Sequence, residues 1–269
     1  MKRFFALVIT LLMCFATCTA VAACDKTVKI DEISIVEPES LVFMSGETFT
    51  LEYTTVPKRA AKKVEVDWET SDENKLSYAD GEFTANICGK VTVKVTAHGR
   101  DNDVSDEITL RVKAPEGFEE SSGRGYQLVY PSEWEWSRQG DIQTWTASND
   151  TTNMNITTEA LNKNYLTATA YTFKSTIEAI YGLLGITVSF TKPVKVTKEN
   201  YLGVDRVRVD YQYSFKILGK TTKLHQTQMI FNNDDVKLSC VLTVTYRAED
   251  FDEKAEQLQE TIFSQFIPA

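Results

Sequence analysis

The sequence is poor in the residues from which most catalytic and metal sites are built. It has two histidines, His98 and His225, and five cysteines, and it contains no HExxH, CxxC or GxSxG motif. A zinc site or a Ser-His-Asp triad therefore lacks its usual framework. Because catalysis needs an acid, a base, a nucleophile or a metal within hydrogen-bond reach, this content favours a protein that is not an enzyme and that carries no cofactor and no metal.

Positive charge and long apolar runs are also scarce. The chain has 29 Lys and Arg against 38 Asp and Glu, and its formal net charge is −9. Nucleic acids require clustered Lys and Arg, so this balance argues against a nucleic-acid partner and against adhesion to anionic lipid. After the apolar run Phe4–Phe15 near the N-terminus, no segment approaches the roughly 20 apolar residues that a membrane-spanning helix needs.

Two acidic loops are the remaining candidates for a metal site. They are Asp101–Asp103 and Asn232–Asp235. Neither follows the twelve-residue EF-hand pattern, and short acidic loops are usually solvated turns. We expect solvated turns, with Ca²⁺ binding as the alternative.

The N-terminus has the three-part pattern of a secretory signal. Two cations follow Met1, an apolar run covers Phe4–Phe15, and small residues precede Cys24. The segment Val21-Ala22-Ala23-Cys24 resembles the lipobox of bacterial lipoproteins. This resemblance implies cleavage before Cys24 and acylation of its thiol, with two or three acyl chains as the anchor. An ordinary cut at Ala20–Ala22 is the alternative.

The lipobox divides the N-terminus into a signal peptide (1–23) and a lipidated tether (24–28). Cys14 and Cys18 then leave with the signal, so Cys88 and Cys240 are the remaining unmodified thiols. Both lie in strand-like runs, where a buried cysteine behaves as a small apolar residue. We expect two inert thiols rather than one disulfide.

Residues 29–113 alternate apolar and polar residues as half-buried strands do. The alternating segments are Thr48–Tyr53, Lys63–Trp68, Lys90–Thr96 and Ile108–Val112. Turn-forming residues separate them, and no segment has the periodicity of an amphipathic helix. Short strands with regular turns predict an all-β sandwich.

The same interval resembles the group 2 bacterial immunoglobulin-like domain. The matching segments are Ser45–Glu47, Val56-Pro57, Val66–Ser71 and Gly89–Ala97. Cys88 departs from the family, which more often has a small or charged residue there. The resemblance implies an immunoglobulin-like module that acts as a spacer or in adhesion, with Trp68 in its core. Alternation of Trp68 with Val64 and Val66 favours the core over a sugar-stacking role.

A polar, glycine-bearing stretch at 114–125 predicts a linker, and a different pattern follows it. Residues 126–269 begin with short strand-like runs. An apolar stripe at helical spacing then runs from Leu166 to Leu184. Three long strands are predicted over 203–217, 223–232 and 236–246, and a last helix over Phe251–Ile262. An antiparallel sheet with two helices to cover it is an α+β domain.

Residues 126–269 resemble the PsbP-like family of α-β-α sandwiches. The matching segments are Tyr130–Trp134, Tyr201–Arg206, Leu242–Tyr246 and Ile262–Phe266. The resemblance covers nearly the whole segment and implies a domain that binds partners without enzymatic activity. The predicted fold is therefore multidomain, with an immunoglobulin-like β-sandwich followed by a PsbP-like α+β domain.

Gly219–Thr222 is similar to the end of a phosphate-binding P-loop. The first glycine of that motif would fall at Ser214, and the segment joins two predicted strands instead of a strand and a helix. We interpret the link Leu218–Lys220 as a hairpin turn.

Large aromatic side chains give the best indication of a binding surface. Trp134 and Trp136 share one face of an extended segment, and Tyr211 and Tyr213 share a face of the long hairpin. Such residues favour burial in a core, and an exposed platform for a glycan or a peptide is the functional alternative. Trp134 matches a buried position of the family. The ligand-binding candidates are therefore Trp136, Trp145, Tyr211 and Tyr213.

These features together predict a lipoprotein on the extracellular face of the cell membrane, without catalytic activity. The first domain is expected to be a spacer, and the second is expected to bind a ligand. The expected partners are the membrane, through the lipid, and a cell-wall glycan or a surface protein, and the protein is expected to be a monomer. The alternative is an accessory or chaperone-like subunit of an exported cell-envelope complex.

Overall fold

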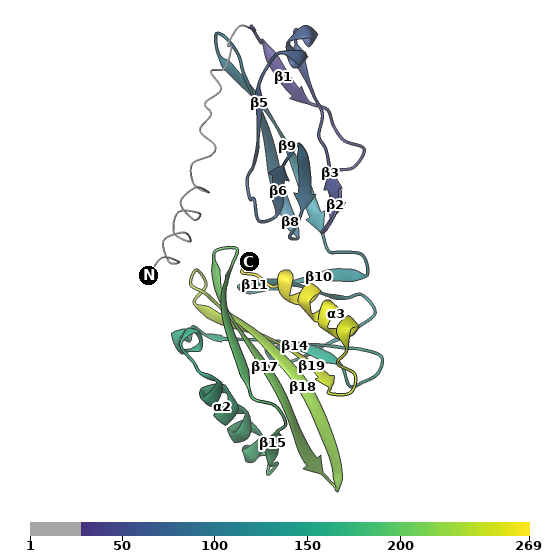
Figure 1. Cartoon of the computed structure of the whole chain (residues 1–269), viewed down its shortest axis with the longest axis vertical. Helices are drawn as coiled ribbons and strands as arrows, with labels where there is room; N and C mark the ends of the chain where they lie inside the picture. Colours follow the sequence, from purple (N-terminus) through teal and green to yellow (C-terminus); the bar gives the residue numbers. More distant parts are fainter. Residues whose placement is uncertain (1–27) are drawn as a thin grey trace, which may run out of the picture. The chain divides into compact units, whose positions relative to one another are not determined.

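The computed structural model describes residues 28–269, and strands dominate them (Figure 1). The predicted signal peptide (1–23), Cys24 and the tether up to residue 27 lie outside the described residues. The chain divides into two compact units. Of the described residues, the first holds 28–42, Thr48–Thr84 and Lys90–Arg111, and the second holds Phe43–Glu47, Ala85–Gly89 and Val112–Ala269.

Residues 28–113 form short strands and one 3₁₀-helix, η1 (Lys58–Lys62). The strands are β1 (Glu32–Ile35), β2 (Val42–Met44), β3 (Thr48–Phe49), β4 (Tyr53–Val56), β5 (Val66–Thr70), β6 (Leu76–Ala79), β7 (Glu82–Ala85), β8 (Gly89–His98) and β9 (Asp103–Lys113). They pair as β1-β4, β3-β7-β6 and β2-β9-β8-β5. The predicted strand Thr48–Tyr53 is divided into β3 and β4, because the two halves pair with different partners. The immunoglobulin-like arrangement stays a prediction.

Strand β8 shows why the alternation of apolar and polar residues predicted strands in this part of the chain. Val91, Val93 and Val95 are 2%, 0% and 0% exposed, while the residues between them are only partly covered. One face of the strand therefore lies in a core. Trp68 packs edge-on against Phe83, with ring centroids 5.5 Å apart, and lies partly buried at the border of the core instead of within it.

The second unit is organised by one antiparallel sheet of eight strands. The order is β12-β13-β14-β19-β18-β17-β15, and β16 pairs with the same edge of β17 as β15. The strands are β12 (Glu135–Gln139), β13 (Ile142–Thr146), β14 (Asn153–Ala160), β15 (Val188–Phe190), β16 (Lys195–Tyr201), β17 (Val204–Ile217), β18 (Lys220–Asn233) and β19 (Leu238–Arg247). The three long predicted strands correspond to β17, β18 and β19.

The predicted linker at 114–125 is wrong over half of its length. β10 (Phe118–Gly123) pairs antiparallel with β11 (Tyr126–Pro131) through six residue pairs. The composition of β10 is polar because most of its side chains are at least partly exposed, and that composition is what predicted a linker. Gly125 forms the turn at φ +88°, a conformation that favours glycine.

Two helices cover opposite faces of the large sheet, α2 (Ala170–Leu183) and α3 (Glu253–Ser264) (Figure 1). The α3 side chains Ile262 and Phe263 pack in one core cluster with Leu242 of β19. Phe173 of α2 packs in another cluster with the neighbouring Val241. Successive residues of a strand point to opposite faces, so the two clusters lie on the two faces of the sheet. We call them the α3 face and the α2 face.

The first helix begins later than its apolar stripe predicts. Leu166 ends a 3₁₀-helix, η2 (Lys163–Leu166), and α2 starts after Thr169, whose side chain accepts from the Thr172 N–H in a capping box. Leu184, the last residue of the apolar stripe, is 70% exposed. Between residues 28 and 269, no helix is both long enough and apolar enough to cross a bilayer.

Candidate functional site

Of the four predicted ligand-binding aromatics, Trp136 alone is exposed. Its exposed fraction is 57%, against 1%, 2% and 1% for Trp145, Tyr211 and Tyr213. The predicted platform of all four residues is therefore wrong. Trp136 lies on β12, at the edge of the sheet, whereas β13 and β17 are internal strands whose large side chains fill the two cores.

Each buried aromatic is held by specific contacts. The Trp145 ring lies 5.3 Å from that of Tyr130, between centroids. The hydroxyl of Tyr211 donates to Gln228 Oε1 at 3.1 Å, and that of Tyr213 donates to Gln226 Oε1 at 2.9 Å. Burial raises the pKa of both tyrosines above its ordinary value, so they stay neutral at physiological pH. These residues stabilise the fold instead of forming a surface.

A small polar cavity lies on the face of β12 that Trp136 also occupies. It has a volume of about 300 Å³ and is lined by Arg124, Tyr126, Arg138, Asp141, Gln143, Ile156, Thr158 and Leu238. Trp136 and Arg138 are two residues apart on β12, so they point to the same face. Their cross-strand partners are Trp145 and Gln143. We call Trp136 with this cavity the β12 site.

The β12 site combines an apolar ring with fixed polar groups. Arg138 Nε donates to the Gly140 carbonyl at 2.9 Å, and Gln143 Nε2 donates to the Tyr126 hydroxyl at 2.8 Å. These bonds hold both side chains at the cavity. A guanidinium binds carboxylate or phosphate through paired hydrogen bonds, and a tryptophan ring packs on flat apolar surfaces. The arrangement is suited to a ligand that has a ring and an anionic or strongly polar group.

The sequence indicated Trp136 but not the residues of the cavity. Arg124 follows β10, Gln143 lies on β13 and Leu238 begins β19. Only the strand register brings them together, and one sequence without its register does not contain that information. Arg138 had a weak signal, because it follows Trp136 by two residues in an extended run.

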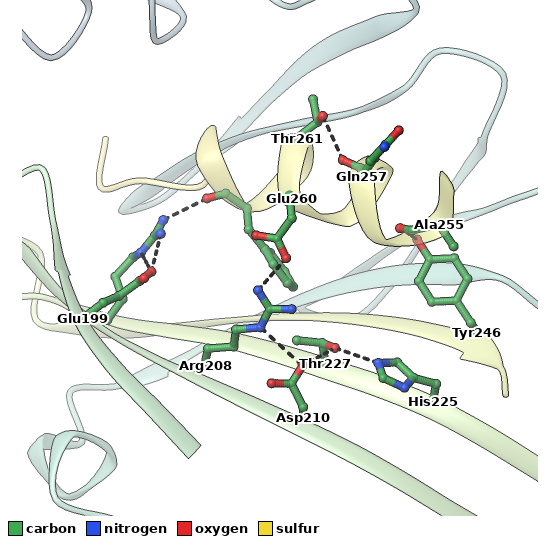
Figure 2. A network of polar contacts seen from close by, with 12 residues as sticks. Glu199, Arg208, Asp210, His225, Thr227, Tyr246, Ala255, Gln257, Glu260 and Thr261 are labelled. Carbon is green, nitrogen blue, oxygen red and sulfur yellow. Dashed lines mark hydrogen bonds and ion pairs between the residues drawn. The ribbon is translucent and has the colours of Figure 1, made fainter. Parts of the chain in front are cut away.

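A second polar cluster joins β17 and β18 to α3 (Figure 2). Arg208 Nε lies 3.3 Å from Asp210 Oδ1, and Arg208 also pairs with Glu260. Thr227 donates to Asp210 Oδ1 at 3.0 Å. The one cation therefore lies between two carboxylates from different elements. Its contacts attach α3 to the sheet.

His225 lies at the end of that cluster. Its ring stacks on Phe251, with centroids 3.6 Å apart and planes at 9°, and its Nε2 lies 3.4 Å from Thr227 Oγ1. Burial lowers the pKa of His225 below 6.5, so the ring is neutral at physiological pH. A stacked, neutral imidazole packs between the sheet and the segment that leads into α3.

His98 has the opposite environment at the end of β8. Nε2 lies 2.8 Å from Asp67 Oδ2, and Nδ1 lies 3.2 Å from Asp103 Oδ2. The hydrogen bonds to Asp67 and then to Asp103 raise the pKa of His98 above 6.5. Within residues 28–269, no group of three or more His, Cys, Asp or Glu side chains could hold a metal ion.

The remaining cysteines are buried thiols, as predicted. Cys88 and Cys240 are 4% and 0% exposed and are not joined by a disulfide. The Cys240 thiol lies 3.6 Å from the Gly125 carbonyl. Burial raises the pKa of Cys240 to about 12, so its thiolate is not formed near neutral pH.

Comparison with known proteins gives distant structural neighbours. No family model matches the chain, and no curated protein matches it. A solved structure from Bacteroides thetaiotaomicron VPI-5482 is similar with a TM-score of 0.36 and 14% identity over 56% of this chain and 48% of that chain, so this chain spans about half of its length. Protein PA94 from Pseudomonas aeruginosa, described as a putative regulator, has a TM-score of 0.34 and 15% identity over 56% and 97%.

A third neighbour is the Ran-binding protein Mog1p from Saccharomyces cerevisiae. Its TM-score is 0.32, with 8% identity over 54% of this chain and 85% of that chain. At such TM-scores and identities, these similarities carry no argument about the family or the function of this chain. The assignment of the second unit to a PsbP-like family is accordingly part of the proposal below.

Proposed function

We propose that the protein is a lipid-anchored binding protein of the extracellular membrane face. In this proposal Cys24 carries the anchor, the immunoglobulin-like part is a spacer, and the PsbP-like part binds a ligand at the β12 site without catalysis. The observation that carries the binding role is the exposure of Trp136. Trp134 and Trp145, the other tryptophans of the second unit, are 6% and 1% exposed.

The energetics of recognition support this role for Trp136. The apolar ring of an exposed tryptophan is poorly solvated by water and offers a large, rigid contact area. Tryptophan and arginine contribute most of the binding energy in many interfaces. At the β12 site Trp136 and Arg138 project from the same face of one strand. The ligand class that fits is a cell-wall glycan or a surface protein with an acidic group.

The binding test compares variants of the β12 site. We expect Trp136→Ala and Arg138→Gln each to weaken binding to purified cell-wall glycan or to a captured surface partner by about tenfold, the change that about 1.4 kcal/mol produces. The affinity is measured by isothermal titration, with folding checked by circular dichroism. Tyr171→Ala is the matched control, because Tyr171 is 80% exposed but lies on α2.

Two results would count against the binding role. Equal affinities for Trp136→Ala, Arg138→Gln and the wild-type protein would show that the ligand does not bind at the β12 site. Steady turnover of a wall-derived substrate by the purified protein would show that the protein is an enzyme and not only a binding protein.

The anchor has its own test. We expect Cys24→Ala to move the protein from the membrane fraction to the supernatant, because the thiol that takes the first acyl chains is lost. Cell fractionation followed by immunoblotting measures the distribution, and Cys240→Ala serves as the cysteine control. Mass spectrometry of an unmodified N-terminus upstream of Cys24 would contradict the lipid anchor.

The alternative, an accessory subunit of an exported complex, is favoured by one surface. At the C-terminal end of α2, Ile180, Leu183 and the following Leu184 are 51%, 89% and 70% exposed. An apolar patch of this kind is typical of protein contacts. Loss of a co-purifying protein partner in Leu183→Glu, with Trp136→Ala unaffected, would favour the accessory role.

A further inference from the structure

The α2 face of the large sheet carries two rows of uncharged polar side chains. The residues of each row are cross-strand partners on neighbouring strands. The first row consists of Gln226, Thr245, Asn153 and Thr146. The second row, two residues along each strand, is Gln228, Thr243, Asn155 and Thr144. Both rows run from β18 across β19 and β14 to β13. Four neighbouring strands thus present only amides and hydroxyls at these eight positions.

Most of these side chains have donors and acceptors that bind no protein group within the described residues. Thr243 and Thr245 are 4% and 9% exposed, and the other six are partly exposed. Gln226 and Gln228 accept from buried tyrosines, and Gln228 Nε2 lies 3.4 Å from Thr243 Oγ1. Among residues 28–269, the side chains of the remaining members make no hydrogen bond to the protein. These members are Thr144, Thr146, Asn153, Asn155 and Thr245.

A cationic cleft continues the rows toward the tip of the β17–β18 hairpin. Its volume is about 430 Å³, and it is lined by Thr151, Lys220, Thr221, Thr222, Lys223, Leu224, Arg247 and Glu249. Leu224 and Arg247 are cross-strand partners, one step beyond Gln226 and Thr245 on the same face. The cleft and the two rows therefore share one side of the sheet.

The charge of the cleft contrasts with that of the chain. Three cations line it against one carboxylate, whereas the whole chain has a net charge of −9. Within the described part of the chain, Lys220 and Lys223 form no ion pair, and Arg247 Nη1 lies 4.0 Å from Glu249 Oε1, at the limit of an ion pair. These cations are thus available to an anionic ligand.

Three residues of the P-loop-like segment Gly219–Thr222 line this cleft: Lys220, Thr221 and Thr222. Gly219 forms the hairpin turn at φ +82°, and Lys220, Thr221 and Thr222 begin β18. The predicted hairpin turn is therefore confirmed. No helix N-terminus follows the glycine, so the cleft has side-chain cations in place of a phosphate-binding backbone loop.

We infer that this side of the sheet is a second binding site, for an acidic carbohydrate. The cations of the cleft would bind carboxylate or phosphate groups of the chain. Amides and hydroxyls both donate and accept hydrogen bonds, as sugar hydroxyls do, so the two rows would bind the neutral positions of the rings. Trp136 points to the opposite side with Trp145, so this site is independent of the β12 site.

The test uses a galacturonic acid oligomer and its methyl ester, which has the same rings without the charge. We expect the purified full-length protein to bind the acid oligomer, with an affinity that falls as salt rises. The variant Lys220→Gln/Arg247→Gln should bind at least about tenfold more weakly, and Asn153→Ala/Gln226→Ala should also lose affinity. Lys254→Gln is the control, because Lys254 is an exposed lysine on α3.

Each other outcome overturns the inference. Three such outcomes are possible: the acid oligomer does not bind, the methyl ester binds equally well, or Lys220→Gln/Arg247→Gln binds the acid oligomer as tightly as the wild-type protein. Inorganic phosphate that binds as tightly as the oligomer would replace the carbohydrate with a simple anion. Trp136→Ala separates the two proposals: we expect Lys220→Gln/Arg247→Gln, and not Trp136→Ala, to weaken binding of the acid oligomer, and the reverse result would place the oligomer at the β12 site and overturn the inference.

Discussion

Replacement of Trp145 by alanine is expected to lower the free energy of unfolding by about 3–5 kcal/mol, the usual cost of truncating a buried tryptophan. Trp145 is 1% exposed and packs against Tyr130 in the α3-face core. Its removal leaves a cavity that the internal strand β13 cannot close without distorting its neighbours. Urea unfolding followed by circular dichroism measures the change.

Two further variants make the Trp145 result specific. Trp136→Ala, at the cross-strand position of the same two strands, should change the free energy of unfolding by no more than about 0.5 kcal/mol, because the side chain is exposed. Trp145→Phe should cost less than Trp145→Ala, since the buried Nε1–H has no hydrogen-bond partner within the described chain. Equal losses for Trp136→Ala and Trp145→Ala would show that Trp145 is not a core residue.

Replacement of Arg206 by methionine is expected to cost about 2–4 kcal/mol, because it removes a buried charge-assisted hydrogen-bond network. Arg206 is 4% exposed on β17 and pairs with Glu199 of β16. Its Nη1 donates to the carbonyls of Phe263 and Phe266, at 2.8 Å and 3.3 Å, where α3 ends. Since Glu199 is 40% exposed, water compensates part of its loss. The Phe263 carbonyl keeps the Phe266 N–H at 3.3 Å, so the loss comes mainly from the two Nη1 bonds and from the Phe266 carbonyl.

Arg247→Met is the matched control for Arg206→Met. Arg247 lies on the long strand β19, which β18 separates from β17; its side chain is 46% exposed, and its contact with Glu249 is 4.0 Å. Exposed ion pairs contribute about 0–1 kcal/mol, so we expect a small change. Thermal or urea unfolding of both variants gives the comparison. Similar losses for the two arginines would mean that Arg206 does not hold the end of α3.

The strands were predictable where one face is buried and the other is wet. β8 alternates between buried valines and partly exposed polar residues, and this pattern is present in the sequence itself. β10 was not predictable in this way, because none of its residues is buried and its stability comes from backbone pairing with β11. A polar strand and a polar linker have the same composition.

The candidate site was only partly predictable, for a related reason. Trp136 and Trp145 are both tryptophans in neighbouring strand-like segments, and they are even cross-strand partners. Their exposed fractions differ by a factor of more than fifty, since one strand is the edge of the sheet and the other is internal. The position of a strand in a sheet depends on pairings between residues far apart in the chain, such as Met154 with Val244.

The sequence by itself determined the small supply of histidine and cysteine, the acidic balance, the lipobox-like N-terminus, and the period of most strands and of both helices, because each is a property of composition or of local spacing. The tertiary structure alone decided which aromatic residue is accessible, which arginines share a cavity, and that three cations collect in one cleft of an acidic chain. These depend on strand order and register, which are set by the burial of two whole sheet faces and not by any one segment.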